Sequence, residues 1–308
     1  MSSFSTFIKL LNKDRAAMMV ALIKKIGIII PDKLYLSLIY KYTFKRQINL
    51  SSPKSFNEKL QWLKLYNRKP EYTTMVDKYA VKEYVANKVG QEYIIKTLGV
   101  WDNANLINWN ALPEKFVLKT TNGGGGTGVV VCKRKETLDK HNAIKKLSHS
   151  LKQDIYKSLR EWPYKDVSHK IIAEELLEEP NKTSPDDYKV MCFDGKVKLI
   201  EYHVGRYSEH HTQDFYDRDW NKTTITQGAY GEFSKEAAPR PALLEEMIRL
   251  SEILAEGIPH CRVDWYLVNN KLYFGEITFF DASGFCPFDK YEDDLLLGSW
   301  ITLPEKTV

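Results

Sequence analysis

The pattern of hydrophobic and polar positions divides the chain into a helical first part and a mixed second part. Apolar residues recur at helical spacing in 16–30, 52–67 and 76–90, and Ser55 and Gly90 stand where a helix N-cap and a helix end are expected. Strand-like apolar runs begin only after the first 115 residues. The pattern therefore predicts an α+β protein whose first hundred residues are mainly helical.

Strands and helices alternate in the second part. The predicted elements are strands at 116–119 and 129–132, a helix at 145–161, a strand beginning at 170 and turning acidic by 179, hairpins at 189–202 and 261–280, and a helix at 242–258. The first hairpin turns on Asp194-Gly195, a strong hairpin dipeptide, and the second turns near Asn269-Asn270.

The register of the second hairpin decides whether Asp264 and Glu276 share one face of the sheet. A two-residue turn would put them on opposite faces, whereas a three-residue loop (269–271), or a bulge with the same effect, places them opposite each other. We predict the second arrangement, because two acids on adjacent strands can hold Mg²⁺. An ordinary cross-strand polar face is the alternative. The residues then expected on the core face are Val263, Trp265, Leu267, Tyr273 and Ile277.

The run NGGGGTG joins the first two predicted strands. Gly123, Gly125 and Gly128 fit G-x-G-x-x-G, but a strand follows where a dinucleotide-binding loop would open a helix. A Walker loop ends in Gly-Lys-Ser/Thr, whereas Val129 follows Gly128. The kinase glycine pattern also fits, yet no HRD or DFG follows. A glycine hairpin after a strand that ends near Lys119 can cradle phosphates with its amides. A flexible surface hairpin without a ligand is the alternative.

Charge is concentrated at the N-terminus. The chain has a net charge of +5, and residues 1–50 hold nine basic against two acidic residues, so the rest of the chain is close to neutral. Such a basic helical arm can contact an anionic membrane or another polyanion, or it can be a solvated helical face. Lys24 and Lys25 interrupt the apolar stretch 16–30, which is too short to span a membrane.

The cysteines and the composition point to an ordinary globular protein. Hydrophobic residues make up 43% and aromatic residues 12% of the chain. The four cysteines form no C-x-x-C pair and no signal-peptide cleavage site is recognisable, so we expect reduced thiols and a cytoplasmic location. We expect neither a zinc site nor nucleic acid as a partner.

Several motifs occur in an order that resembles the ATP-grasp superfamily. More closely, the chain is similar to the TupA-like ATP-grasp family found with teichuronopeptide and surface-polysaccharide synthesis, and the likeness covers residues 50–302. The motifs that carry it are VDKYAVKEYV (76–85), ALPEKFVLKT (111–120), the glycine hairpin, AEELLEE, DYKV, GRYSEHHTQDFYDRDWN (205–221), RVDWY, YFGEITFFDASGF and LGSWI (297–301).

This resemblance implies an ATP-grasp fold, in which two α+β subdomains clamp ATP, preceded by a mainly helical N-terminal region. The domain organisation that we expect is a basic amphipathic helical arm at 1–50, a helical region at 51–110, a lid subdomain with the glycine-rich hairpin at 111–175, and a core subdomain with the metal site at 176–308.

The resemblance also implies roles for individual residues. The expected ATP-binding residues are Lys119, Gly123, Gly124, Gly125, Gly126 and Gly128 on the phosphates, Glu175 and Leu177 at the adenine, Glu178 or Glu179 at the ribose, and Lys189 as a second phosphate lysine. Asp264 and Glu276 would bind Mg²⁺, with Thr278 in the place of an asparagine that is common in such enzymes. Arg262, with Lys119, would be catalytic and would steady the acyl phosphate.

The activity implied is carboxylate–amine ligation with ATP and Mg²⁺. A carboxylate of a small molecule or polysaccharide precursor, such as a uronic acid, would become an acyl phosphate, and an amine such as an amino acid would then displace phosphate. Arginines, histidines and aromatic residues gather in 202–220 and suit an acceptor. The substrate residues expected there are His203, Arg206, His210 and Arg218.

Two other functions remain open from the sequence. Asp217 and Asp219 form a D-x-D triplet of the kind that binds the metal of a nucleotide sugar, which would make the chain a metal-dependent glycosyltransferase. The chain could also be an ATP-binding or interaction protein without catalysis. Lys78, within the first of the shared motifs, lies either near the site or on a solvent-facing helix surface.

Overall fold

A computed structural model describes most of the chain. The described residues are 15–124, 126–179, 182, 184–205, 211–228 and 232–307. Gly125, Arg206 and His210, which the sequence analysis proposed as binding residues, lie outside this part of the chain. The first 14 residues of the basic arm lie outside it as well.

Helices dominate the first hundred residues, as the sequence predicts. The α-helices are α2 (Arg15–Ile26), α3 (Asp32–Phe44), α4 (Phe56–Tyr66), α5 (Glu71–Val76), α6 (Ala80–Val89), α7 (Lys140–Leu151), α8 (Ile155–Leu159), α9 (Leu244–Leu254) and α10 (Tyr291–Ser299). The helix expected at 76–90 is shorter, because Asp77 caps the backbone N–H groups of Tyr79 and Ala80 and separates α5 from α6. The helix expected at 145–161 is divided into α7 and α8.

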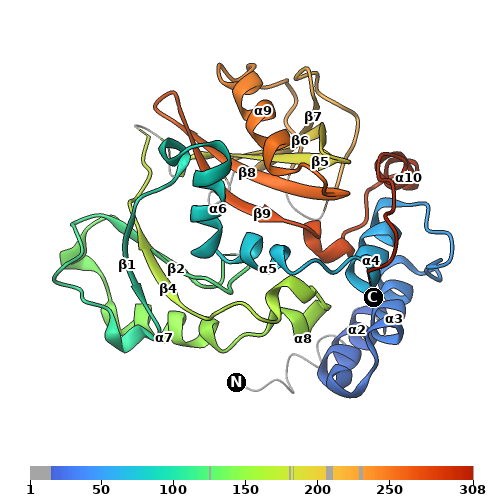
Figure 1. Ribbon diagram of the computed structural model, residues 1–308, viewed down its shortest axis with the longest axis horizontal. Coiled ribbons are helices and arrows are strands. Elements are labelled where there is room, and N and C mark those ends of the chain that lie inside the picture. The colour runs from blue at the N-terminus through green and yellow to red at the C-terminus, as the bar shows by residue number, and fades with distance from the viewer. Residues whose placement is uncertain are drawn as a thin grey trace.

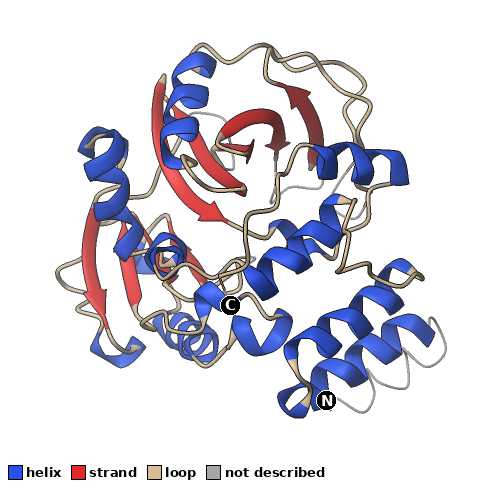
Figure 2. Cartoon of the chain, turned by 45° about the vertical axis from the view of Figure 1, so that its right-hand side comes forward, coloured by secondary structure: helices blue, strands red, loops and turns tan. Residues whose placement is uncertain are grey.

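The strands of the described residues form two antiparallel sheets. The strands are β1 (Thr97–Trp101), β2 (Phe116–Thr120), β3 (Val129–Cys132), β4 (Ile171–Glu174), β5 (Asp186–Phe193), β6 (Lys196–Val204), β7 (Thr212–Asp217), β8 (His260–Val268) and β9 (Lys271–Thr278). One sheet has the order β1-β4-β2-β3 and the other β7-β6-β5-β8-β9. Figures 1 and 2 show the sheets as separate units on either side of α5 and α6.

Both sheets end in a strand that the sequence analysis did not predict. β1 pairs with β4 through a bulged register, and none of its residues is fully buried. β7 pairs with β6 at the edge of the other sheet. Because β1 belongs to the smaller sheet, that sheet draws on residues from the region expected to be helical.

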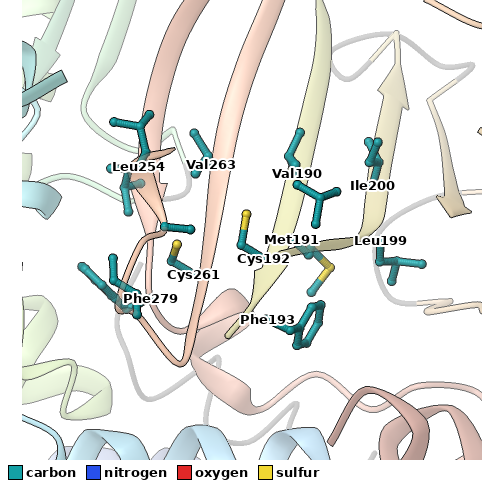
Figure 3. Close-up of a cluster of buried hydrophobic side chains, with 14 of the residues drawn as sticks. Val190, Met191, Cys192, Phe193, Leu199, Ile200, Leu254, Cys261, Val263 and Phe279 are labelled. Atoms are coloured by element: carbon teal, nitrogen blue, oxygen red, sulfur yellow. The ribbon is translucent and has the colours of Figure 1, made fainter. Parts of the chain in front are cut away.

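The larger sheet is covered by α9 on the face turned away from the smaller sheet (Figure 1). Val263 and Trp265 of β8 point to this face and are fully buried, and the indole N–H of Trp265 donates to the hydroxyl of Ser251 on α9 (2.9 Å). Figure 3 shows part of this core, where Leu254 of α9 lies near Val263. All four cysteines are free and buried.

The register of β8 and β9 confirms the predicted pairing by way of a bulge. The turn has two residues, Asn269 and Asn270, both with positive φ. A register shift at Gly275 then restores the pairing of Asp264 with Glu276. Tyr273 is wrong as a core residue, because it pairs with Tyr266 before the bulge, and Phe274 is buried opposite Trp265 instead.

The N-terminal helices pack beside the larger sheet. α2 and α3 form a hairpin against α4, and a small apolar cluster that includes Tyr35, Ile39 and Leu65 joins them (Figure 1). Among the described helices, none has the length and apolar character needed to cross a bilayer. α4 starts with a capping box, in which Ser55 accepts from the N–H of Glu58 and Glu58 accepts from the N–H of Ser55.

Replacing Ser55 with alanine is expected to lower the free energy of unfolding by about 1 kcal/mol, because the buried N-terminus of α4 loses one capping acceptor. Ser52→Ala is the matched control, since Ser52 is exposed and its side chain does not cap α4. Urea denaturation measures both variants. Equal stability of the two would contradict a role for the capping box.

Candidate active site

A cleft lies between the two sheets. Its wider part is lined by β2, β3 and the segment 174–179 that follows β4, and its narrower part by the glycine hairpin on one side and by β8 and β9 on the other. Lys119, Val129 and Tyr266 line both parts, so the two are continuous. The cleft therefore brings the predicted ATP-binding residues of the smaller sheet to the predicted metal ligands of the larger one.

Lys119 is held by a buried carboxylate that the sequence analysis did not identify. Glu174 at the end of β4 pairs with Lys119 (2.6 Å) and with Lys82 of α6 (2.5 Å). Burial alone would raise the pKa of Glu174, but the two lysines outweigh it and hold the pKa below its usual value. Glu174 thereby keeps the ammonium of Lys119 at the wall of the cleft.

The outer glycines of the hairpin are needed for close packing. A Cβ on Gly123 would lie 2.5 Å from the hydroxyl of Thr120, and one on Gly128 would collide with Thr120 and Ser150. The two hydroxyls are hydrogen-bonded to each other (2.8 Å), which ties the base of the hairpin to α7. Gly126 has a φ of 75°, a conformation that favours glycine. Gly123, Gly126 and Gly128 line the narrow part of the cleft.

The segment that follows β4 lines the wide part of the cleft. Glu175, Leu177, Glu178 and Glu179 all contribute to its wall, together with Tyr266. Glu178 pairs with Lys115 (2.6 Å) and Glu179 pairs with Lys182 (2.7 Å). The structure thus brings these predicted nucleotide residues together in one segment between the two sheets.

On the opposite wall, charged residues of neighbouring strands stand in one cross-strand row. Glu276 of β9 pairs with Asp264 of β8, Asp264 with Lys189 of β5, and Lys189 with Glu201 of β6. Residues paired in this way point to the same face of a sheet. The ammonium of Lys189 lies 2.6 Å from Asp264 and 2.9 Å from Asp187, which stands two residues before it on the same face.

Arg262, like Lys189, is paired with more than one carboxylate. It donates two hydrogen bonds to Asp264 (2.7 and 2.9 Å), one to Asp281 and a longer one to the hydroxyl of Thr278 (3.4 Å). Burial disfavours the charged guanidinium, but the surrounding carboxylates raise the pKa of Arg262 well above its usual value. Burial raises the pKa of Asp281 above its usual value although Arg262 acts in the opposite direction.

Lys78 belongs to this site. Its ammonium, from the turn between α5 and α6, pairs with the carboxylate of Glu276, and Lys78 lines the narrow part of the cleft. Partial burial raises the pKa of Glu276, but Lys78 and Arg262 more than offset this, so the pKa lies below its usual value. Helical periodicity gave no reason to prefer this position over a solvent-facing one.

The donor set at Asp264 and Glu276 fits a magnesium ion that shares its coordination with phosphates. Within the described residues, no group of three or more His, Cys, Asp or Glu side chains is arranged to enclose a metal. Mg²⁺ commonly uses one or two carboxylates and completes its octahedron with water and phosphate oxygens. Thr278 lies next in the chain on the same strand face, but its hydroxyl accepts from Arg262.

The two predicted acceptor residues in the described part of the chain, His203 and Arg218, lie on opposite faces of the larger sheet. His203 of β6 is buried and hydrogen-bonded to Glu201 (2.6 Å) on the cleft face of the sheet. Arg218 instead pairs with Glu252 of α9, on the covered face. Asp217 accepts from the N–H groups of Asp219 and Asn221 and from the side chain of Asn221, so the D-x-D triplet forms a hydrogen-bonded turn after β7.

Sequence reasoning missed Glu174, Asp187, Glu201 and Asp281. The two-residue spacing of Asp187 and Lys189 was a usable signal, because strand residues two apart share a face. Glu201 and His203 show the same spacing on the next strand. Asp281 follows the end of β9 in a short turn, where no periodicity applies.

Glu174→Gln is expected to lower the free energy of unfolding at neutral pH by about 3 kcal/mol, because Lys82 and Lys119 lose the carboxylate between them. The native pKa of Glu174 lies below its unfolded value, so its contribution is full above about pH 4.3 and is lost as the pH falls further. Urea denaturation at pH 7 and pH 3.5 should show the difference between wild type and variant shrinking in acid. The control Glu178→Gln breaks an exposed ion pair with Lys115 and should lower the free energy of unfolding by less than 1 kcal/mol. A Glu174→Gln variant as stable as this control would contradict the role of Glu174 as the shared partner of Lys82 and Lys119.

Among solved structures, the chain shows weak likenesses to ATP-dependent ligases. A D-alanine–D-alanine ligase from Bacillus anthracis complexed with ATP is 16% identical, with 67% of this chain and 54% of that chain covered and a TM-score of 0.39. The D-alanine–D-alanine ligase from Helicobacter pylori is 17% identical, with 81% of this chain and 70% of that chain covered and a TM-score of 0.40. The ATP-grasp ligase PsnB, complexed with a phosphomimetic variant of a minimal precursor, Mg and ADP, is 13% identical. The match covers 87% of this chain and 70% of that chain, with a TM-score of 0.40. The chain spans about half of the length of the first of these ligases.

A family model gives the clearest result. No curated protein matches the sequence. The model described as TupA-like ATP-grasp matches residues 58–302, which include both sheets and the cleft between them. The chain belongs to the TupA-like ATP-grasp family.

Proposed function

We propose that this protein is an ATP- and Mg²⁺-dependent carboxylate–amine ligase that forms an amide through an acyl phosphate. The observation that carries the proposal is the cleft in which Lys119 and the glycine hairpin face Asp264 and Glu276. Membership of an ATP-grasp family supports it. Anion-binding groups on one wall and acids suited to a hard cation on the other are what a metal-bound polyphosphate requires.

In the proposed reaction, a carboxylate oxygen of the substrate attacks the γ-phosphorus of ATP, the bond to the bridging oxygen breaks, and ADP leaves. The neutral amine nitrogen then attacks the acyl carbon, the carbon–oxygen bond breaks, phosphate leaves with the electron pair, and the nitrogen loses one proton to the departing phosphate. Lys119 and Lys189 neutralise phosphate charge, and Arg262 stabilises the acyl phosphate and the tetrahedral species that follows. Positioning and charge stabilisation carry out this chemistry without a nucleophilic side chain.

The remaining positions of the cleft take complementary roles in this proposal. Glu175 and Leu177 border the adenine, Glu178 or Glu179 the ribose, and the glycine hairpin closes over the β- and γ-phosphates. Asp264 and Glu276 hold the Mg²⁺ ion, with Thr278 beside them. The metal would supply charge neutralisation on the transferring phosphate.

The substrates that we propose are an amino acid, or a similar amine, and a uronic acid or related carboxylate of a surface-polysaccharide precursor. The support for this is the TupA-like family alone. Such a reaction uses ATP and would take place in the cytoplasm. A glycosyltransferase at Asp217 and Asp219 is not favoured, because Asp217 is engaged by backbone N–H groups of its own turn.

Lys119→Ala and Asp264→Asn are each expected to lower Mg²⁺-dependent phosphate release from ATP by about 10²- to 10³-fold, since each removes one charge from the phosphate and metal site. Phosphate release is measured with pairs of uronic acids and amino acids. The proposal requires that release depends on both an acid and an amine, and that the product is an amide detectable by mass spectrometry.

Two control variants sharpen this test. Lys140→Ala, at an exposed position of α7, and Asp217→Asn should leave phosphate release within about twofold of wild type. Circular dichroism confirms that each variant is folded. Turnover of a nucleotide sugar that is lost in Asp217→Asn and kept in Asp264→Asn would replace the ligase by the glycosyltransferase.

We also propose that the basic arm contacts the anionic inner face of the membrane. In its described part, Leu22, Ile26, Ile29 and Leu34 are exposed at one end of the α2–α3 hairpin, beside exposed lysines. Apolar side chains flanked by basic residues suit an anionic bilayer surface.

Co-sedimentation with phosphatidylglycerol vesicles, but not with phosphatidylcholine vesicles, is the result expected of this contact. The double variant Ile29→Asp, Leu34→Asp should reduce the bound fraction at least tenfold. Leu106→Asp, at an exposed position far from the arm in sequence, should not. Binding that is equal for the three proteins would rule out the arm as the contact surface.

A further inference from the structure

At the β6 end of the charged row, the cleft face of the larger sheet carries a group of polar side chains that no step of the proposed reaction uses. It consists of Glu201 and His203 of β6, Gln213 of β7, and His211 just before β7. We call it the Glu201 cluster. Glu201 and His203 are 4% exposed and Gln213 is fully buried. Buried polar side chains are costly unless they are fully hydrogen-bonded, so this cluster needs an explanation.

The cluster lies next to the proposed reaction centre. Glu201 stands directly opposite Lys189, whose ammonium contacts Asp264, and His203 stands opposite Asp187. Directly opposite residues of an antiparallel pair have Cβ atoms about 5 Å apart and point to the same face. Glu201 is therefore one strand away from Lys189, which we propose to bind phosphate, and two strands away from the proposed metal ligand Asp264.

Hydrogen bonds within the cluster fix one oxygen of Glu201. Oε1 accepts from Nε2 of His203 and from the side-chain amide of Gln213, each at 2.6 Å. Nδ1 of His203 in turn is hydrogen-bonded to Nε2 of His211 (2.8 Å). Burial would raise the pKa of Glu201, but His203, Arg262 and Lys189 lower it to about 2, so the carboxylate stays charged.

Two acceptors of the cluster have no donor. In the described part of the chain, Oε2 of Glu201 and Oε1 of Gln213 are both buried and accept no hydrogen bond. A buried acceptor without a donor costs about 1–3 kcal/mol, and more when it is charged. Two such oxygens in contacting side chains indicate a place for a ligand that donates hydrogen bonds and accepts none.

We propose that the Glu201 cluster binds the amino group of the nucleophile, with Oε2 of Glu201 and Oε1 of Gln213 accepting its N–H bonds. This inference rests on the proposed ligase, because it supplies the second substrate of that reaction. A primary ammonium is a compact cation with donors only, as a lysine side chain is. Bound there, it gives up one proton to water before its nitrogen attacks the acyl carbon. His203 and His211 are positioning residues that orient the carboxylate.

Ion pairs join the row to its neighbours. The carboxylates in these pairs are Asp187, Glu201, Asp264, Glu276 and Asp281, and the cations are Lys78, Lys189 and Arg262. Glu201 is separated from Asp264 by Lys189 in the row, so the amine and the metal have separate carboxylates.

A binding test that needs no turnover uses methylammonium and tetramethylammonium, two cations of equal charge of which only the first donates hydrogen bonds. At saturating methylammonium the wild-type melting temperature should rise by about 2 °C above its value in equimolar tetramethylammonium. Glu201→Gln and Gln213→Leu should abolish this difference. Lys198→Gln, exposed on the same strand, should retain it.

Each outcome decides the proposal. Equal melting temperatures in the two cations, or a difference that survives in both cluster variants, would overturn the amine site. The amine site would also be overturned if Mg²⁺ no longer raised the melting temperature of Glu201→Gln while the methylammonium difference remained. That result would make Glu201 a metal ligand. Loss of the difference in both variants but not in Lys198→Gln supports it.

Steady-state kinetics then separate this site from the ligase proposal. Glu201→Gln should raise the KM for the amine at least tenfold and change the KM for ATP less than twofold, whereas a merely structural defect would change both. A specific methylammonium effect without any amide formation would leave the amine site standing and overturn the ligase. Amide formation without the methylammonium effect would support the ligase and overturn the amine site.

Discussion

Lys189 and Arg262 are two cations buried in the floor of the cleft, and the requirement to keep them charged is the constraint on which the rest of the site depends. Removal of a charge from water costs several kcal/mol unless hydrogen-bonded counter-charges replace the water. Asp264 serves both cations at once, with Asp187 completing the shell of the first and Asp281 that of the second. A one-residue slip of β8 would turn Asp264 to the apolar face under α9 and leave two charges without their shared partner. The two-residue turn of the hairpin would by itself place Asp264 and Glu276 on opposite faces, and the bulge at Gly275 brings them to the same face.

This constraint gives the helical N-terminal region a part in the site. Asp281 begins a turn in which Ala282 and Ser283 both have positive φ, a conformation that needs support from its surroundings. Two buried side chains of α4 provide it: Gln61 and Lys64 donate to the carbonyl oxygen of Ser283 at 3.1 and 2.7 Å. Lys64 is fully buried, and this burial lowers its pKa to about 7. The capped helix thus positions the carboxylate that holds Arg262.

The sequence predicted those features that depend on short spacing. The Asp194-Gly195 turn, the glycine hairpin and the pairing of Asp264 with Glu276 all follow from neighbouring residues and the two-residue period of a strand. The contacts that the sequence did not predict join distant segments. Lys78, for example, pairs with the carboxylate of Glu276, 198 positions away. β1 escaped prediction because its residues are uniformly half-buried, so no apolar alternation marks it. The roles of these residues toward ATP and metal were expected from family resemblance, which periodicity could not have supplied.

The contact of Gly123 and Gly128 with the hydroxyls of Thr120 and Ser150 has a mechanical consequence. Because the base of the glycine hairpin is fastened to the end of α7, and Asn122 also bonds to the carbonyl oxygen of residue 153 there, the hairpin base lacks the independence of a free flap. Any widening of the cleft would then move the hairpin base together with the end of α7. The glycines would serve as a tight joint between the hairpin and the helix.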